Sequence, residues 1–201
     1  MLAHALYAAA HQLTSRLMTT SACASHPMSM PTSVARSKKY EPLQLVQMFR
    51  LAAELRTKML AGGFTDNGGA IHSAERILNI LGLRIRYPAL SHINNLRKLP
   101  DAPFSVAAFA AFHEGRKVLI EHVSPHRELT RAAIERINRG VTDDEFLEFV
   151  RSNFALALLT EEETTRLNRL NRSTMQSDRL ARAGIELHAA QCTQLTAAGM
   201  P

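Results

Sequence analysis

Tryptophan is absent from this 201-residue chain, and aromatic residues make up only 5% of it. Apolar residues of all kinds still reach 46%, which is ordinary for a globular protein. Leucine, isoleucine, valine and alanine must therefore supply most of the core. A chain of this length is long enough for one domain with a hydrophobic core of its own.

Cysteine is also scarce, because Cys23 and Cys192 are the only two and lie near opposite ends of the chain. This spacing excludes a disulfide framework and any CxxC metal motif, so we expect a reducing, cytoplasmic setting. No apolar run approaches the ~20 residues of a membrane-spanning helix, and we expect no membrane partner. The sequence also lacks the GxSxG, HExxH and GxxxxGK[ST] motifs, which leaves serine hydrolase, zincin and phosphate-loop chemistries without support.

Acidic residues are missing from the first 40 positions, which hold Arg16, Arg36, Lys38 and Lys39. Removing these four from the 24 basic residues of the chain leaves 20, against 18 acidic residues over positions 41 to 201. The body of the protein is therefore close to neutral, although the whole chain carries a net charge of +6. Bulk charge alone does not identify a partner.

Composition divides the chain into three parts. Residues 1–41 end in a Ser-, Thr- and Pro-rich stretch and are expected to be a disordered or targeting-like extension, since an acid-free leader with scattered arginine is similar to an organellar or export signal. Residues 42–190 are expected to form a single globular domain, helical over 42–99 and α+β over 104–190. Residues 191–201 read as a frayed tail.

The first part of this domain is predicted to be helical. Apolar residues recur at steps of three and four after Pro42, and Gly62 ends this helix. Ser73 is predicted to cap a second helix that ends at Gly82, and a third runs over 90–99. Two short helices joined by a turn form a loose helix-turn-helix pattern.

The second part mixes strands and helices. The apolar runs 117–123 and 153–160 have strand length, while 104–112 fits either a strand or a short alanine-rich helix. Helices are predicted after Pro125, after the capping box of Thr142 and Glu145, and after that of Thr160 and Glu163. We therefore predict a predominantly helical α+β fold with a small sheet packed by helices.

One stretch of this part carries residue types suited to phosphodiester hydrolysis. The run "KVLIEHV" ends in Glu121 and His122, a second strand begins near Asn153, and a helix with Asn168 follows. A neutral histidine accepts a proton from water near pH 7, and hard oxygen ligands hold Mg²⁺ or Mn²⁺ beside the scissile phosphate. An asparagine amide can orient the histidine ring.

The order strand, strand, helix with a strand-end acid–histidine pair resembles the HNH (ββα-metal) endonuclease site over residues 117–172. The resemblance implies His122 as general base, Asn153 as its orienting residue, and Glu121 and Asn168, or less well Glu162, as ligands of Mg²⁺ or Mn²⁺. A regular strand would aim Glu121 and His122 in opposite directions, so the pairing requires a bend before Pro125. About thirty residues and two helices also separate His122 from Asn153, more than that family's compact hairpin contains.

Two other segments suggest a nucleic-acid partner without catalysis. The helix predicted over 90–98 carries Asn94, Arg97 and Lys98, residue types that contact bases and phosphates. Arg166, Arg169 and Arg172 recur at three-residue spacing along another helix and suit a row of phosphates. The alternative to the endonuclease is therefore a DNA-binding regulator or a protein-interaction module that uses residues 90–98.

Overall fold

The computed structural model describes residues 40–66 and 69–188. The predicted tail 191–201 and all but the last two residues of the predicted extension 1–41 lie outside them. The described part belongs to one compact unit, Lys39–Pro201. It contains these elements: α1 (Pro42–Ala61), α2 (Ala70–Arg86), the 3-10 helix η1 (Ile93–Lys98), α3 (Val106–His113), β1 (Leu119–His122), α4 (His126–Asn138), α5 (Asp143–Asn153), β2 (Leu156–Leu159), α6 (Glu161–Leu170) and α7 (Arg179–Arg182). The predicted α+β fold, predominantly helical with one small sheet, is confirmed.

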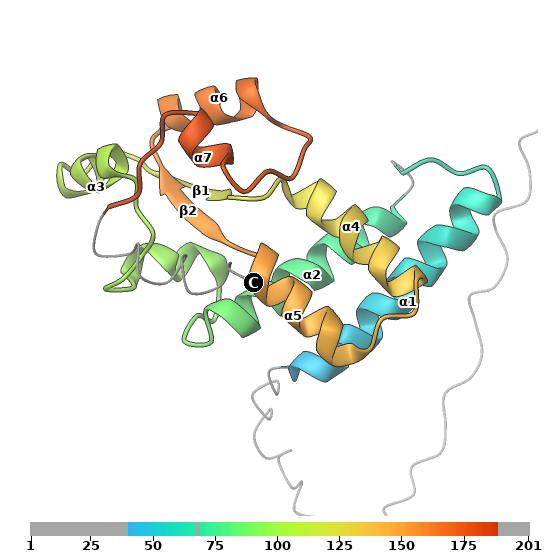
Figure 1. Ribbon diagram of the computed structural model, residues 1–201. Coiled ribbons are helices and arrows are strands. Elements are labelled where there is room, and N and C mark those ends of the chain that lie inside the picture. The colour runs from blue at the N-terminus through green and yellow to red at the C-terminus, as the bar shows by residue number, and fades with distance from the viewer. Residues whose placement is uncertain (1–39, 67–68, 189–201) are drawn as a thin grey trace, which may run out of the picture. The chain divides into compact units, whose positions relative to one another are not determined.

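Helices α1, α2, α4 and α5 pack against one another on one side of the sheet, and we call them the bundle (Figure 1). Helix α6 contacts β1, and α3 contacts β2, on the sheet side of the domain. None of the helices among the described residues is long and apolar enough to span a bilayer.

The sheet consists of β1 and β2, which pair antiparallel with Glu121 opposite Ala157 and His122 opposite Leu156. Side chains alternate between the two faces of a strand. Leu156 and Leu158 accordingly join the core of the bundle, whereas Ala157 and Leu159 join a second cluster with residues of α6 and the 183–187 segment. The sheet thus separates two hydrophobic clusters.

The loop before α3 and the last described residues extend this sheet. The amide of Leu158 donates to the carbonyl of Pro103 at 2.7 Å, and the amide of Ser105 donates to the carbonyl of Leu158 at 2.9 Å. On the other side of this segment the amide of His188 donates to the carbonyl of Phe104 at 2.9 Å. These bonds satisfy the edge of β2 that faces away from β1.

Helix ends follow the predicted capping chemistry in most places. Pro42 begins α1, and the two capping boxes at Thr142 and Thr160 are both formed. The run 104–112, for which strand and helix were both open, contains α3, because the Ser105 hydroxyl accepts the Ala108 amide as its cap. The second predicted strand begins at Leu156, and Asn153 instead ends α5.

Helix α2 differs most from its predicted bounds. It begins at Ala70 rather than after Ser73, and it continues through Gly82 to Arg86. A Cβ atom at Gly82 would lie 2.3 Å from the Phe154 ring, so the glycine is needed for close packing rather than for a helix end. Gly82 was predicted to end the helix, but the reason for a glycine at this position is its contact with Phe154.

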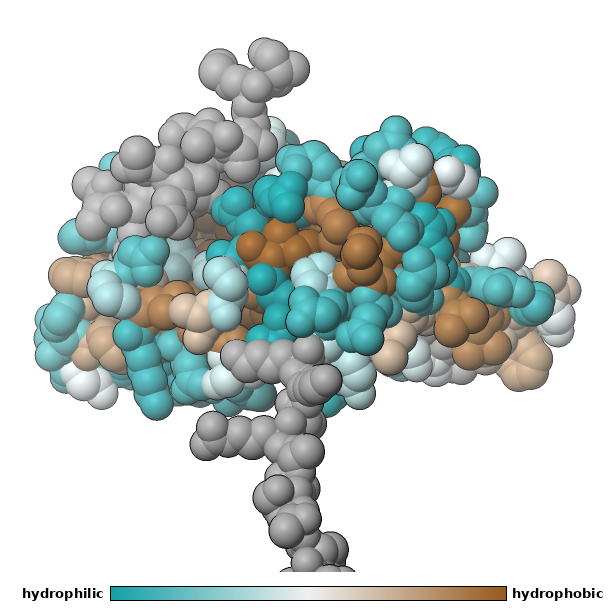
Figure 2. Space-filling model, turned by 90° about the horizontal axis from the view of Figure 1, so that it is seen from below, coloured by the Kyte–Doolittle hydropathy of each residue, from teal (hydrophilic) through white to brown (hydrophobic). Residues whose placement is uncertain are grey.

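Helix α1 leaves part of its apolar surface uncovered. Leu43, Leu51 and Leu55 are at least half exposed, with Leu51 the most open at 67%. On the face shown in Figure 2, apolar residues form separate groups bordered by hydrophilic ones. Isolated exposed leucines of this kind are common on protein surfaces and do not by themselves define a site.

Candidate nucleic-acid interface

Glu121 and His122 lie on opposite faces of β1. Their strand partners show this directly, because Ala157 opposite Glu121 belongs to one hydrophobic cluster and Leu156 opposite His122 to the other. The bend that would have aimed both side chains at one site is not formed within the strand. Glu121 and His122, the predicted metal ligand and general base, therefore lie on the sides of two different hydrophobic clusters.

His122 packs toward the bundle. Its ring centroid lies 4.4 Å from that of His126 and 5.5 Å from that of Phe154. Its Nε2 atom lies 3.2 Å from the Oδ1 atom of Asn79 on α2. An asparagine does contact this histidine as the resemblance implied, but it comes from a helix 43 residues earlier.

Burial makes His122 a very weak base. Loss of hydration, together with the charges of His126 and Arg179, lowers the pKa of its imidazole to about 3. Burial also lowers the pKa of the His126 imidazole beside it, against the opposing effect of Glu75. Since an efficient general base has a pKa near the working pH, a histidine this acidic is unsuited to activating water at pH 7.

Asn153 makes only a local contact. Its Nδ2 atom donates to the carbonyl of Phe149 at 2.8 Å, one turn earlier in α5. Its predicted place at a strand start was wrong, because the residue belongs to the last turn of a helix that continues until Phe154. No contact to His122 is made by Asn153 in the part of the chain described here.

Glu121 and Asn168, the two predicted metal ligands, both interact with a cation of the protein, Arg179. Nη2 of Arg179 donates to Oδ1 of Asn168 at 3.3 Å, and the charge of Arg179 acts on Glu121. Burial raises the pKa of the Glu121 carboxyl, and Arg179 offsets part of that effect.

Arg179 is only 3% exposed and its guanidinium is held by backbone carbonyls. Nη1 donates to the carbonyls of His122 and Val123 at 2.9 and 3.0 Å, and Nε donates to that of Asn171 at 2.8 Å. The guanidinium therefore occupies the space where a divalent ion would need oxygen ligands. Over residues 40–66 and 69–188, no three His, Cys, Asp or Glu side chains are placed to hold a metal. The predicted ligand set does not fit Mg²⁺ or Mn²⁺.

The predicted helix over 90–98 is a six-residue 3-10 helix, η1, instead of an α-helix. The His92 side chain caps it by accepting the Asn94 amide, and Pro100 follows directly. Asn94 and Lys98 are exposed, whereas the Arg97 guanidinium turns inward and donates to the Val118 carbonyl at 2.9 Å. This bond holds η1 against the segment that leads into β1.

Arg166 and Arg169 lie on the exposed side of α6, whereas Arg172, predicted to continue the row along the helix, lies beyond its end at Leu170. Nε of Arg166 donates to the Ala183 carbonyl at 2.6 Å, which ties α6 to the segment after α7. Arg169 and Arg172 are exposed and form no salt bridge with another described residue.

These cations connect into a row around the sheet side, which we call the basic track: Arg97, Lys98, Arg116, Lys117, Arg166, Arg169 and Arg172. The Arg97–Val118 bond places η1 beside Lys117. Arg116 and Arg166 line the same pocket, and Arg166 and Arg169 line the next one. Arg116 and Lys117 were not predicted from the sequence, because their proximity to α6 and η1 depends on contacts between distant segments.

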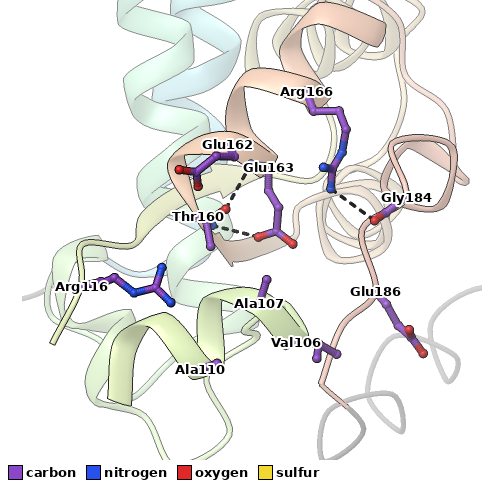
Figure 3. Close-up of a pocket in the computed structure, with 10 residues that line it drawn as sticks. All are labelled: Val106, Ala107, Ala110, Arg116, Thr160, Glu162, Glu163, Arg166, Gly184 and Glu186. Carbon is purple, nitrogen blue, oxygen red and sulfur yellow. Dashed lines mark hydrogen bonds between the residues drawn. The ribbon is translucent and has the colours of Figure 1, made fainter. Parts of the chain in front are cut away.

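The pocket between α3 and α6 has a volume of about 560 Å³. Arg116 and Arg166 enter it from different walls, together with Glu162 and Glu186 (Figure 3). Glu163 lies at its base, where Oε2 accepts the Ser105 hydroxyl at 2.6 Å and the Thr160 amide at 2.9 Å. The pocket has mixed charge, so the free cations of the track lie beside it rather than in it.

The ion pairs of the described residues are distributed unevenly. Apart from Arg116 with Glu114, every salt bridge within residues 40–66 and 69–188 involves α1, α2, α4, α5 or the adjoining loops. Lys98, Lys117, Arg169 and Arg172 form none. In the bundle, Arg76, Arg84, Arg86 and Arg136 likewise form no salt bridge with a described residue, so what distinguishes the basic track is that its unpaired cations follow one another along the sheet side.

Comparisons with protein families, curated proteins and solved structures find no match for this chain. What the protein does must be argued from its own residues.

Proposed function

We propose that this protein binds nucleic acid through the basic track without cleaving it. The observation that carries the proposal is that four cations of the track, Lys98, Lys117, Arg169 and Arg172, form no salt bridge with a carboxylate of the described residues. A phosphate backbone attracts such cations and releases its counterions when they bind. The exposed Asn94 beside Lys98 adds a hydrogen-bonding group that can reach a base or a sugar.

Metal-dependent cleavage is less well supported than binding. An endonuclease of the HNH type needs its base, orienting asparagine and metal ligands at one point. In this chain the acid and the histidine diverge, and the histidine has a pKa of about 3. The cations of the basic track do not depend on the geometry of Glu121 and His122. The proposed binding therefore does not require a catalytic site.

The experiment is a titration of a fluorescent 20-nucleotide probe with the full chain at low salt, followed by anisotropy. The variant Lys98→Gln/Lys117→Gln/Arg169→Gln removes three free charges of the track. Its control, Lys58→Gln/Arg139→Gln/Arg151→Gln, removes three exposed charges that are paired on the bundle. Because the basic residues of positions 1–39 are the same in every protein, their contribution cancels.

We expect the track variant to bind at least about ten-fold more weakly than the wild type, because each lost phosphate contact removes a counterion-release term. The control should stay within about two-fold. An equal loss of affinity in both variants would mean that binding depends on net charge alone, and would overturn the basic track as the binding surface. A probe that remains intact when Mg²⁺ or Mn²⁺ is added supports binding without cleavage.

A further inference from the structure

An exposed aromatic side chain stands at the C-terminal end of α3, next to the basic track. Phe112 is 38% exposed, and the buried residues of α3 are the small Ala108 and Ala111. One side of the Phe112 ring is supported by the buried Phe104 ring, with centroids 5.1 Å apart. His113 beside it is exposed and contacts Phe109 at 4.4 Å. The Phe112 ring is therefore held in place with part of its surface open.

The turn after α3 places two cations within five residues of Phe112 along the chain. Gly115 has φ of 74°, a value that favours glycine, and it reverses the chain just after the helix. The amide of Arg116 then donates to the Ala111 carbonyl at 2.8 Å, which holds the turn against the last turn of α3. Arg116 and Lys117 consequently follow within one short turn of Phe112.

The geometry of η1 does not suit recognition of a double-stranded nucleic acid. Six residues in a 3-10 helix are too few to fill a major groove, which accepts an α-helix or a two-stranded ribbon. Binding of unpaired bases does not require an α-helix or a ribbon of this kind. Proteins that bind single strands combine a row of cations along the backbone with aromatic rings on which bases stack. The basic track and Phe112 supply both parts.

We infer that the basic track binds single-stranded nucleic acid, with one base stacked on the Phe112 ring while Arg116, Lys117 and Lys98 contact the neighbouring phosphates. This inference rests on the proposed function and names the strand form that the surface accepts. Stacking requires a flat ring, whereas the packing of Phe112 on Phe104 requires only an apolar side chain. The two roles can therefore be separated by substitution.

The test uses the full chain and three labelled probes: a 15-nucleotide oligo-dT, a 15-nucleotide oligo-U and a mixed-sequence 15-base-pair duplex. Phe112→Leu keeps an apolar side chain on Phe104 but removes the ring, and Phe112→Trp restores a larger ring. The matched control is Phe64→Leu, at an exposed phenylalanine between α1 and α2. Circular dichroism and thermal unfolding verify that each variant is folded.

We expect Phe112→Leu to weaken binding of the single-stranded probes about ten-fold, because stacking of one base is worth ~1–3 kcal/mol. Duplex binding should change less than about two-fold, Phe112→Trp should restore binding, and Phe64→Leu should have no effect. The two single-stranded probes show whether DNA or RNA is preferred. Salt-sensitive binding of all probes with no effect of Phe112→Leu would overturn the stacking inference alone, whereas absence of binding to every probe would overturn the proposed function as well.

Discussion

The bundle and the sheet side of this domain use positive charge in different ways. In the bundle, some arginines join separate segments through ion pairs: Arg50 contacts Asp143 at 2.8 Å, and Arg56 contacts Asp66 at 2.7 Å. On the sheet side, Arg179 and Arg166 donate to backbone carbonyls instead, and Lys98, Lys117 and Arg169 remain free. Ion pairs therefore join segments of the bundle, whereas Lys98, Lys117 and Arg169 on the sheet side are available to an external anion.

This difference separates stability from binding. A substitution in the bundle or at its contact with the sheet should lower the free energy of unfolding and leave binding unchanged in the folded protein. A substitution of an unpaired cation of the basic track should weaken binding and leave the free energy of unfolding unchanged.

Gly82→Ala should be the most destabilising change, by about 3 kcal/mol. Its new methyl group would lie 2.3 Å from the Phe154 ring, which is 1% exposed and cannot move without repacking the core. The gain of helix propensity, ~1 kcal/mol, does not offset this clash. Chemical denaturation measures it, with Gly62→Ala as the control, because no atom approaches within 3.4 Å there. Equal stability of both variants would show that α2 and Phe154 are not packed as described.

Arg179→Met should cost about 2 kcal/mol. The substitution leaves the carbonyls of His122, Val123 and Asn171 without their buried donor. Arg182→Met, three residues later at an exposed position, should be close to neutral. Urea unfolding compares the two variants, and a stability of Arg179→Met equal to that of the wild type would contradict the role assigned to its guanidinium.

Acid should destabilise the protein through His122. The ordinary histidine pKa of 6.5 falls to about 3 in the folded state, so between these values the unfolded chain binds a proton that the folded chain does not. The stabilisation is complete above pH 6.5 and decreases as pH falls, by at most ~1.4 kcal/mol per pH unit. Unfolding measured from pH 6.5 to 5 should therefore show a slope that His122→Phe flattens.

The control for this slope is His72→Gln, at an exposed histidine of α2. It should retain the wild-type pH dependence. A slope that persists unchanged in His122→Phe would mean that His122 is protonated as readily in the folded chain as in the unfolded one.

Arg50→Gln should have the smallest effect on stability, about 1 kcal/mol. Its guanidinium donates to Asp143 at 3.0 and 2.8 Å and to the Val141 carbonyl at 2.7 Å, but the ion pair is partly open to solvent. Nucleic-acid affinity should not change. Lys98→Gln should give the opposite pattern, with weaker binding and unchanged stability. A loss of binding in Arg50→Gln would contradict the separation of stability from binding.

Local chemistry made much of this fold predictable. Capping boxes at Thr142 and Thr160, the start of α1 at Pro42 and the strand length of the two apolar runs all depend on neighbours within a few residues. Gly82 was misread because its reason lies in a ring 72 positions later. The position of η1 likewise involves a hydrogen bond from Arg97 to Val118, a residue 21 positions later that no local pattern points to.

The candidate site was only partly predictable for the same reason. Strand alternation already placed Glu121 and His122 on opposite faces, and the paired register agrees with it. The arginines of α6 were found from their spacing. Asn79 beside His122 and Arg179 beside Asn168 were not, because both contacts join distant segments. Sequence spacing identifies residues that share an element, but not those that the fold brings together.

The most direct test of the central claim is the salt dependence of nucleic-acid binding. Affinity of the wild type for a single-stranded probe, measured from about 50 to 200 mM salt, should fall linearly on a log–log plot. Lys98→Gln/Lys117→Gln/Arg169→Gln should reduce the slope by about 2, since each phosphate contact on a single strand contributes ~0.7. The bundle control Lys58→Gln/Arg139→Gln/Arg151→Gln should keep the wild-type slope. A slope unchanged by the track variant, or reduced equally by the control, would contradict the assignment of binding to the basic track.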